Sequence, residues 1–314
     1  MGGAMAVAPH SRLLVGQHFS FGCFRSSSIS IKRQQQQRRF LLMGSDHYQE
    51  KAAKYWDHFY KIHHNKFFKD RHYLEKDWGR FFSAEKDQEA KVVLEVGCGA
   101  GNTIFPLIAA FPNLYVHACD FSPHAISLVK SHGDFREDQV NAFVCDVTSD
   151  DLCQKIVPFS VDIVTLIFML SAVSPKKMPL LLQNIRRILN PNGYVLVRDY
   201  ATGDFAQERL TSRNQMIGEN FYVRGDGTCV FCFSEDCLST LFKREGFNTV
   251  EINVYCKQIK NCSRNIVMDR YVQFFLQYFK LLQFFLIIRV FLSFNIFFSS
   301  FFSISMSRMY LTLH

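Results

Sequence analysis

The stretch Val92–Asn102, with the sequence VVLEVGCGAGN, decides the fold of this chain. A short apolar run leads to the acid Glu95, and glycines then stand at alternate positions, Gly97, Gly99 and Gly101. Such glycines let a strand turn sharply into a helix and let a ligand approach the backbone, because no Cβ is in the way. Since residue 102 is Asn, the spacing is Glu-x-Gly-x-Gly-x-Gly and not the Gly-x-Gly-x-x-Gly of dinucleotide sites. The turn therefore favours S-adenosylmethionine, which has no pyrophosphate to place at a helix N-terminus.

Strand-like and helix-like segments alternate along the central region. The predicted strands are residues 92–96, 114–120, 140–147, 161–170 and 193–200, the last entered through a turn at 190–193. The predicted helices lie at about 101–111, 123–132, 149–156 and 176–189. A helix near 235–246 and strands near 248–256 and 265–275 complete the pattern. This order predicts an α/β fold, a seven-stranded and mostly parallel sheet with helices on both faces.

Acidic residues stand at the ends of several predicted strands, and ligands of such sheets bind at the carboxyl ends of the strands. Asp120 lies about twenty residues past the glycine turn, where a carboxylate can accept hydrogen bonds from both ribose hydroxyls. Asp146 ends the next strand and can accept from an adenine amino group, while Val147 packs on the ring. One strand-end Asp is often only a helix cap. Acids at successive strand ends after a glycine turn predict a nucleoside-like cofactor.

Six further segments carry a resemblance to a known family. They are Lys54–Tyr60, Asn65–Tyr73, Ala118–Pro123, Ile167–Val173, Arg198–Tyr200 and Gly218–Arg224. Together with the glycine turn they resemble the Rossmann-like class I methyltransferases that form 3-methylcytidine in tRNA, over about residues 46–275. The resemblance implies methyl transfer from S-adenosylmethionine to N3 of a cytidine in the anticodon loop of certain tRNAs. It also implies that some members need a partner protein, such as an aminoacyl-tRNA synthetase.

The resemblance assigns residues to the cofactor site. In that family the tryptophan and tyrosine that match Trp56 and Tyr60 close over the cofactor. The positions that line its pocket match Gly97, Asp120, Asp146, Val147 and Ile167, and the glycine turn adds Glu95, Gly99 and Gly101 to the expected site. Without the family, Trp56 and Tyr60 are four residues apart and share one face of a helix. They are then either two core aromatics or an aromatic lid near the sulfonium.

The segment Asn65–Tyr73 has the composition of a contact with single-stranded RNA. Bases stack on aromatic faces and phosphates pair with Lys or Arg, whereas a solvated loop rarely holds three large aromatics. A basic insert after the fifth strand, with Arg209, Arg213 and Arg224, is either a substrate lid or ordinary polar surface. The predicted RNA contacts are Lys66, Phe67, Phe68, Lys69, Arg71, His72 and Arg224.

Arg198 and Asp199 stand at the end of the fifth predicted strand, on the acceptor side. Cytosine N3 carries a free lone pair at neutral pH, so no base has to remove a proton before attack. The product base is positively charged, and the enzyme therefore acts mainly by positioning and electrostatics. We predict that Asp199 and Arg198 hold the cytosine edge and that the carboxylate stabilises the developing charge. The alternative is a buried ion pair that only shapes the strand end.

The ten cysteines form no regular framework, which fits free thiols in a reducing compartment. Cys229 and Cys232 form a C-x-x-C pair with Cys237 nearby, but zinc usually needs a second pair at matched spacing. Phe231 and Phe233 indicate a strand with buried thiols instead. We therefore expect no metal site.

The net charge of +8 is carried by the ends of the chain. Residues 1–45 hold six Lys/Arg and residues 276–314 hold three, and neither segment has an acid. Removing these nine from the total of 36 leaves 27 Lys/Arg against 28 Asp/Glu in residues 46–275. RNA binding must therefore rest on local patches of the predicted methyltransferase domain.

The two ends suggest different fates for the chain. Residues 1–45 resemble a mitochondrial or chloroplast transit peptide, or else a disordered leader, while translation from Met43 predicts a cytoplasmic protein. Residues 276–314 are rich in Phe, Leu and Ile, and 290–306 have no charge. This tail is a membrane anchor, a segment packed on the domain, or a product of splicing or gene prediction, and we favour the last.

Two other functions stay open at this level. The same fold can methylate a protein or a small molecule, in which case the Asn65–Tyr73 segment has no part in substrate binding. The chain can also be a non-catalytic binding module.

Overall fold

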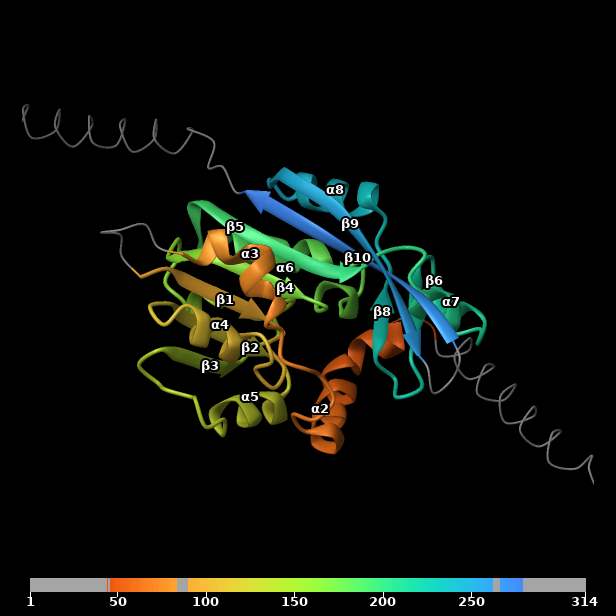
Figure 1. Ribbon diagram of the computed structural model, residues 1–314, viewed down its shortest axis with the longest axis horizontal. Coiled ribbons are helices and arrows are strands. Elements are labelled where there is room, and N and C mark those ends of the chain that lie inside the picture. The colour runs from red at the N-terminus through yellow and green to blue at the C-terminus, as the bar shows by residue number, and fades with distance from the viewer. Residues whose placement is uncertain (1–43, 45, 84–89, 262–265, 279–314) are drawn as a thin grey trace, which may run out of the picture. The chain divides into compact units, whose positions relative to one another are not determined.

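The computed structural model describes residues 44, 46–83, 90–261 and 266–278. Its centre is a sheet in the order β3-β2-β1-β4-β5-β10-β9 (Figure 1). The strands are β1 (Val92–Val96), β2 (Tyr115–Asp120), β3 (Val140–Val144), β4 (Val161–Ile167), β5 (Leu189–Tyr200), β9 (Asn248–Asn261) and β10 (Ile266–Tyr278). β1 to β5 pair in parallel, whereas β10 is antiparallel to both β5 and β9. The order reverses at β1 and β4, and the carboxyl ends of these two strands form the edge where ligands of such sheets bind.

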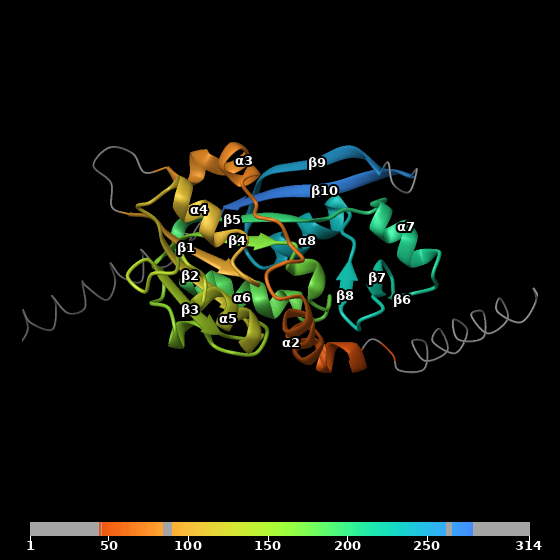
Figure 2. The ribbon, with the colours of Figure 1, turned by 60° about the horizontal axis from the view of Figure 1, so that its bottom comes forward.

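Helices cover both faces of this sheet, as predicted. On one face lie α3 (Tyr73–Phe82), α4 (Ile104–Ala110) and α5 (Pro123–Lys130), which share an apolar core with β1 to β5. The opposite face carries α6 (Met178–Ile188), which contacts α8 (Glu235–Arg244). Figure 2 shows α3 and α4 on one side of the strands and α6 on the other. The expected α/β architecture with a mostly parallel sheet is confirmed.

The predicted helix at 149–156 is wrong. Only a single 3-10 turn, η1 (Leu152–Gln154), forms there. Asp146 accepts from the backbone N–H of Thr148, and Asp151 accepts from that of Cys153. Because these side chains bond to nearby backbone groups, they compete with the helical hydrogen bonds.

The predicted turn at 190–193 lies inside β5, which begins earlier than expected. Leu189 already pairs with Val161, and the register then shifts before Tyr194 pairs with Ile163. Asn192 takes up the irregularity in a left-handed conformation, with φ of 74°. Asn tolerates this region better than most residues, so the strand continues through the turn signal.

A small sheet lies in the insert between β5 and α8. It consists of β6 (Met216–Gly218), β7 (Phe221–Val223) and β8 (Cys229–Phe231), and α7 (Phe205–Thr211) precedes it. Backbone hydrogen bonds join the two ends of the insert: the N–H of Phe233 donates to Tyr200 O, and the carbonyl of Phe233 accepts from Thr202 N, each at 2.9 Å. Cys229 and Cys232 are buried free thiols, so the prediction of a strand with buried thiols is confirmed.

The expected leader at 1–45 and the apolar tail lie almost wholly outside the described residues, apart from 44 and 276–278. Within the described part of the chain, no helix combines the length and the hydropathy that a membrane crossing needs.

Candidate active site

The glycine turn connects β1 to α4 in the way its sequence predicts. Gly97, Gly99 and Gly101 all have positive φ values, of 68°, 55° and 89°. Each is also a place of close approach, since a Cβ would collide with Met169 at Gly97 and with the Phe105 ring at Gly101. The turn is tied to β2 because the N–H groups of residues 97 and 98 both donate to the carbonyl of residue 119. Only glycine therefore fits these three positions.

Asp120, at the end of β2, faces the turn. Its Oδ2 accepts from Gly99 N at 3.0 Å and its Oδ1 accepts from Ser122 N at 2.9 Å. Burial raises the pKa of this carboxyl to about 6, although the two backbone donors act in the opposite direction. Each oxygen keeps a further acceptor site. A pair of vicinal hydroxyls, as on a ribose, fits this arrangement.

Asp146 and Val147 follow β3 and form the next part of the site. Oδ1 of Asp146 accepts from Thr148 N and Oγ1 at 3.0 and 2.7 Å. Oδ2 has no hydrogen bond with any residue that the structure describes, so it is open to a donor such as an exocyclic amine. Val147 is buried, 4% exposed, and supplies an apolar wall beside it.

The helix α2 (Ala52–His63) closes the site from the other side. Trp56 and Tyr60 stack with ring centroids 6.2 Å apart, on one helix face as predicted. Asp57, on the same helix, accepts from Ser122 Oγ at 2.7 Å and lies 2.9 Å from His124 Nδ1. These contacts fasten α2 to the start of α5, next to Asp120.

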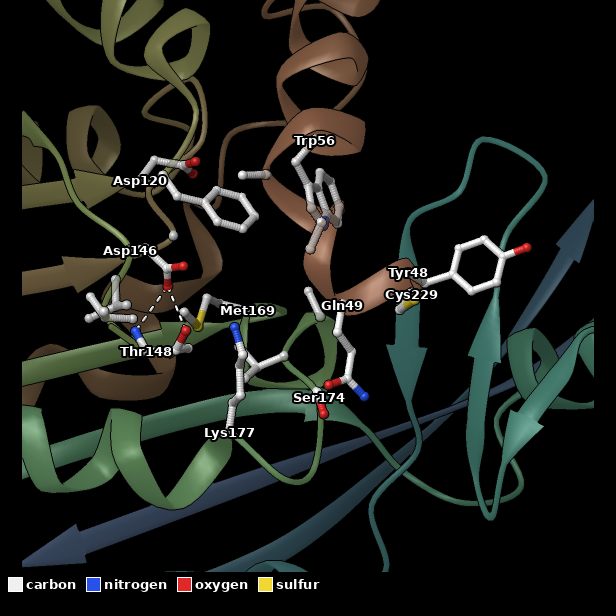
Figure 3. A pocket seen from close by; sticks show the side chains of 18 of the residues that line it. Tyr48, Gln49, Trp56, Asp120, Asp146, Thr148, Met169, Ser174, Lys177 and Cys229 are labelled. Carbon is white, nitrogen blue, oxygen red and sulfur yellow. Dashed lines mark hydrogen bonds between the residues drawn. The ribbon is translucent and has the colours of Figure 1, made fainter. Parts of the chain in front are cut away.

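A first cavity, of about 170 Å³, lies between these groups. Asp120 and Asp146 reach it from the sheet, and Trp56 faces them from α2 (Figure 3). Gly97, Val147 and Met169 also line it. The cavity therefore combines the carboxylates of Asp120 and Asp146 with apolar walls and an aromatic face, and these groups suit an adenosine with a sulfonium.

A second cavity adjoins the first and has a different lining. Both share Trp56, Tyr60, Gly97, Phe168 and Ala172. The second continues past them to Phe67, Phe68, Arg71, Ile167, Tyr200 and Arg224. In the second cavity, aromatic rings surround two arginines and Asp226, whereas in the first the acids outnumber Lys177.

Phe168 stands at the junction of the two cavities, and the sequence analysis missed it. It directly follows β4 and has φ of 53°, a conformation rare for a bulky residue. Its N–H donates to Arg198 O at 2.7 Å, and its ring lies 5.1 Å from that of Tyr200. Strained residues of this kind gather at functional sites. The only sequence signal was its place in the segment Ile167–Val173.

The predicted RNA segment divides into two groups. Phe67, Phe68 and Arg71 line the second cavity, as does Arg224 from the insert. Lys66, Lys69 and His72 are exposed and line neither cavity, and the same holds for Arg209 and Arg213. The structure therefore brings Phe67, Phe68 and Arg71 to the site and leaves the other basic residues of the segment on the surrounding surface.

Glu95 and Gly101 were predicted for the cofactor but line neither cavity. Glu95 is 2% exposed and lies 3.6 Å from Arg71 Nη1. Burial raises the pKa of this carboxyl to about 7, while the guanidinium lowers it. Glu95 and Arg71 thus form a buried pair behind the turn, and their direct contact with ligands stays a prediction.

Arg198 and Asp199 also stand back from both cavities. Arg198 donates to Asp77 Oδ2 at 2.8 Å and lies over the Tyr73 ring at 4.0 Å. Asp199 is fully buried and accepts from the backbone N–H groups of Ser171 and Tyr200 at 2.8 and 2.9 Å. Burial raises its pKa to about 6. Both neighbours line the second cavity, so this geometry gives Asp199 an indirect route to the acceptor side.

No cluster of three His, Cys, Asp or Glu that could hold a metal ion occurs among the described residues. Cys237, near the C-x-x-C pair, is exposed, whereas the pair itself is buried.

Comparison with known proteins agrees with this geometry. A family model described as "Methyltransferase domain" matches residues 94–195. Among solved structures, a SAM-dependent methyltransferase from Anabaena variabilis covers 73% of this chain and 95% of its own, with a TM-score of 0.56 and 14% identity. Another from Methanosarcina mazei covers 62% and 95%, with a TM-score of 0.50 and 18% identity. These two share the fold.

Curated relatives are more informative. The human tRNA N(3)-cytidine methyltransferase METTL6 is 42% identical over 232 residues, which is 72% of this chain and 81% of that protein. The Schizosaccharomyces pombe tRNA N(3)-methylcytidine methyltransferase trm141 is 38% identical over 225 residues, or 71% and 90%. Relatives this similar over most of both chains share more than a fold, and the resemblance drawn from the sequence is confirmed. The chain is an S-adenosylmethionine-dependent methyltransferase and belongs to the tRNA N(3)-cytidine methyltransferase family.

Proposed function

We propose that this protein transfers the methyl group of S-adenosylmethionine to N3 of a cytidine in the anticodon loop of tRNA. The observation that carries the proposal is the meeting of two unlike cavities at Trp56, Tyr60, Gly97 and Phe168. One offers carboxylates to a nucleoside, and the other offers aromatic rings and the guanidinium of Arg224 to a nucleotide. A methyl donor and a base that enter from the two sides meet there.

The first cavity holds the cofactor. Asp120 accepts from the ribose hydroxyls, Asp146 Oδ2 accepts from the adenine amino group and Val147 packs on the ring. When bound, the cofactor supplies an electrophilic methyl group on a sulfonium. The stacked rings of Trp56 and Tyr60 attract that positive charge and exclude water from it.

The second cavity holds the acceptor. Phe67, Phe68 and Tyr200 offer faces on which an unstacked base can lie. Arg224 donates to Cys229 O at 3.1 Å within the insert, and its guanidinium lies 5.9 Å from the centre of the Tyr200 ring in the same cavity. Since cytosine N3 is already a nucleophile, alignment with the methyl group is the main task of these residues.

The exposed basic residues of the segment bind RNA phosphates outside the acceptor cavity. In the sequence, Phe67 and Phe68 are flanked by Lys66 on one side and by Lys69 and His72 on the other. Phosphates pair with basic side chains of this kind. Their contribution gives affinity without base specificity.

Asp199 acts through Ser171 and Tyr200, whose N–H groups it holds. These two residues line the acceptor cavity, so the carboxylate lies directly behind its wall. It adds negative potential where the methylated base becomes positive. Arg198 keeps α3 in place through Asp77.

We also propose that an aminoacyl-tRNA synthetase assists binding, and that residues 1–45 direct the chain to an organelle unless translation begins at Met43. The composition of residues 1–45 supports the second point.

The test uses the full chain with S-adenosylmethionine and total tRNA, with and without purified aminoacyl-tRNA synthetases. The tRNA is digested and 3-methylcytidine is quantified by mass spectrometry, with Asp120→Ala as the control that lacks cofactor binding. A rise in 3-methylcytidine that Asp120→Ala abolishes is the expected result. Cofactor binding without any 3-methylcytidine, in either condition, contradicts the proposal and points to a protein or small-molecule acceptor.

A further inference from the structure

The segment that lines the acceptor cavity is bonded to the cofactor turn. Asn102, directly after the third glycine of the turn, donates from Nδ2 to Phe68 O at 3.2 Å and to Asp70 Oδ1 at 3.0 Å. Its own carbonyl accepts from Arg71 N at 2.9 Å. One residue thus makes three hydrogen bonds to residues 68–71. Asn102 is also the residue that breaks the dinucleotide pattern in the sequence.

The side chain of Arg71 returns to the same turn. Nη1 donates to Thr103 Oγ1 at 2.7 Å and lies 3.6 Å from Glu95 Oε1. The arginine side chain is only 14% exposed, and Glu95 is 2% exposed. Neither carboxylate oxygen of Glu95 has a hydrogen bond in the described part of the chain. Removing the guanidinium would leave a buried acid without its counter-ion, which is costly.

These contacts span the turn. Glu95 precedes the glycines, and Asn102 and Thr103 follow them. Arg71 therefore contacts both ends of the turn, while Phe67 and Phe68 of the same segment form the wall of the acceptor cavity. A turn held in one conformation by the cofactor also holds that wall in one conformation.

We infer that Arg71 and Asn102 are positioning residues that couple occupancy of the cofactor cavity to RNA binding in the acceptor cavity. This inference rests on the proposed function and refines it, because it removes Arg71 from the phosphate contacts expected from the sequence. Coupling of this kind is reciprocal, so the cofactor product tightens RNA binding by the same factor as RNA tightens the product. A factor of at least about five is expected.

The experiment measures a binding cycle with the full chain. The probes are S-adenosylhomocysteine and an unmodified tRNA transcript with a cytidine in its anticodon loop. The dissociation constant of the transcript is measured without and with saturating S-adenosylhomocysteine, and that of S-adenosylhomocysteine without and with the transcript. The variants are Arg71→Lys, which keeps the charge, and Asn102→Asp, which keeps the shape but loses the Nδ2 donor.

Lys66→Ala is the matched control, because Lys66 is an exposed cation of the same segment. It should weaken RNA binding equally in both states, lower the salt dependence and leave the coupling factor intact. Arg71→Lys and Asn102→Asp should instead bring the coupling factor towards one. Thermal unfolding and the affinity for S-adenosylhomocysteine alone confirm that each variant is folded.

Three results would overturn the inference. The first is a wild-type coupling factor of one. The second is that Arg71→Lys behaves like Lys66→Ala, which would make Arg71 a phosphate contact. The third is that wild-type protein binds S-adenosylhomocysteine but no RNA in either state, which removes the proposed function as well.

Discussion

The hydroxyl of Tyr60 lies where a side chain at Gly99 would have to stand, since a Cβ there would be 2.5 Å from Tyr60 Oη. The tyrosine comes from α2 and the glycine from the turn after β1, so the aromatic lid is seated directly on the turn. The N–H of Gly99 also donates to Asp120. A change at residue 99 therefore disturbs the lid and the strand-end carboxylate together.

Gly99→Ala should weaken S-adenosylhomocysteine binding by about tenfold or more, equal to about 1.4 kcal/mol, because alanine is strained at this positive φ and displaces the tyrosine. Isothermal calorimetry measures the effect. Gly133→Ala is the control, because a Cβ there meets no atom within 4 Å. Equal affinities for the two variants would contradict the seating of the lid on the turn.

Asp57→Ala should loosen α2 and lower the cofactor affinity. It removes the contacts with Ser122 and His124, which are each worth about 1 kcal/mol, so a several-fold loss is expected. Asp134→Ala is the matched control, because Asp134 also pairs with a histidine, His132 at 3.7 Å, but lines neither cavity. Calorimetry that finds no difference between the two variants would show that the fastening is unimportant.

The buried acid behind the turn predicts how stability depends on pH. Burial raises the pKa of Glu95 from 4.5 to about 7, so the folded protein keeps a proton that the unfolded chain has released. The contribution to the free energy of unfolding is full below pH 4.5 and is lost as the pH rises through about 7. A shift of this size corresponds to on the order of 3 kcal/mol.

Glu95→Gln should therefore make the decline of melting temperature between pH 5 and 8 shallower in the cofactor-free protein, while the raised pKa values of Asp120 and Asp199 maintain the rest of the decline. Asp138→Asn is the control, because that exposed carboxyl has a lowered pKa and titrates below this range. If the melting temperatures of wild type and Glu95→Gln fall in parallel as the pH rises, Glu95 holds no proton in the folded protein over this range.

Phe67→Ala should weaken binding of the tRNA transcript by about 1–3 kcal/mol, since it removes a stacking face. Cofactor affinity should change little. Ile62→Ala is the control, because Ile62 and Phe67 are both 56% exposed but only Phe67 lines the acceptor cavity. Fluorescence anisotropy compares them, and a similar loss for both would mean that Phe67 contributes only apolar surface.

Asp199→Asn should slow single-turnover methylation by about tenfold while cofactor affinity stays the same. The amide keeps the shape but offers one acceptor where two N–H groups need one each. Asp162→Asn is the control, because Asp162 also accepts from a backbone N–H, that of Val92, but at the amino end of the sheet. An unchanged rate would mean that the charge of Asp199 has no effect on methylation of the acceptor.

Much of the fold was predictable because local patterns and strand-end positions determine it. The glycine turn, Asp120 and Asp146 fall where the spacing puts them, since parallel strands bring their carboxyl ends to one edge. The prediction of a helix at 149–156 was wrong because helix propensity does not show that the side chains of Asp146 and Asp151 accept hydrogen bonds from nearby backbone N–H groups.

Roles that depend on distant partners were not predictable. Arg71 stands in a basic, aromatic segment that suits RNA, and only the structure shows its guanidinium on Thr103 and beside Glu95. Phe168 takes a left-handed conformation that no sequence signal marks. Both residues are set by contacts with other elements.

The hydrogen bonds that join the two ends of the insert have a consequence for how such enzymes diversify. The chain leaves the main sheet at Tyr200 and comes back beside the end of β5 at Phe233, where backbone hydrogen bonds hold the two points together. The residues between them can change in length and surface without altering the order of the strands. Choice of acceptor can therefore evolve, or be grafted in the laboratory, as long as Phe221 and Cys229 are kept, because these two residues of the insert also line the cofactor cavity.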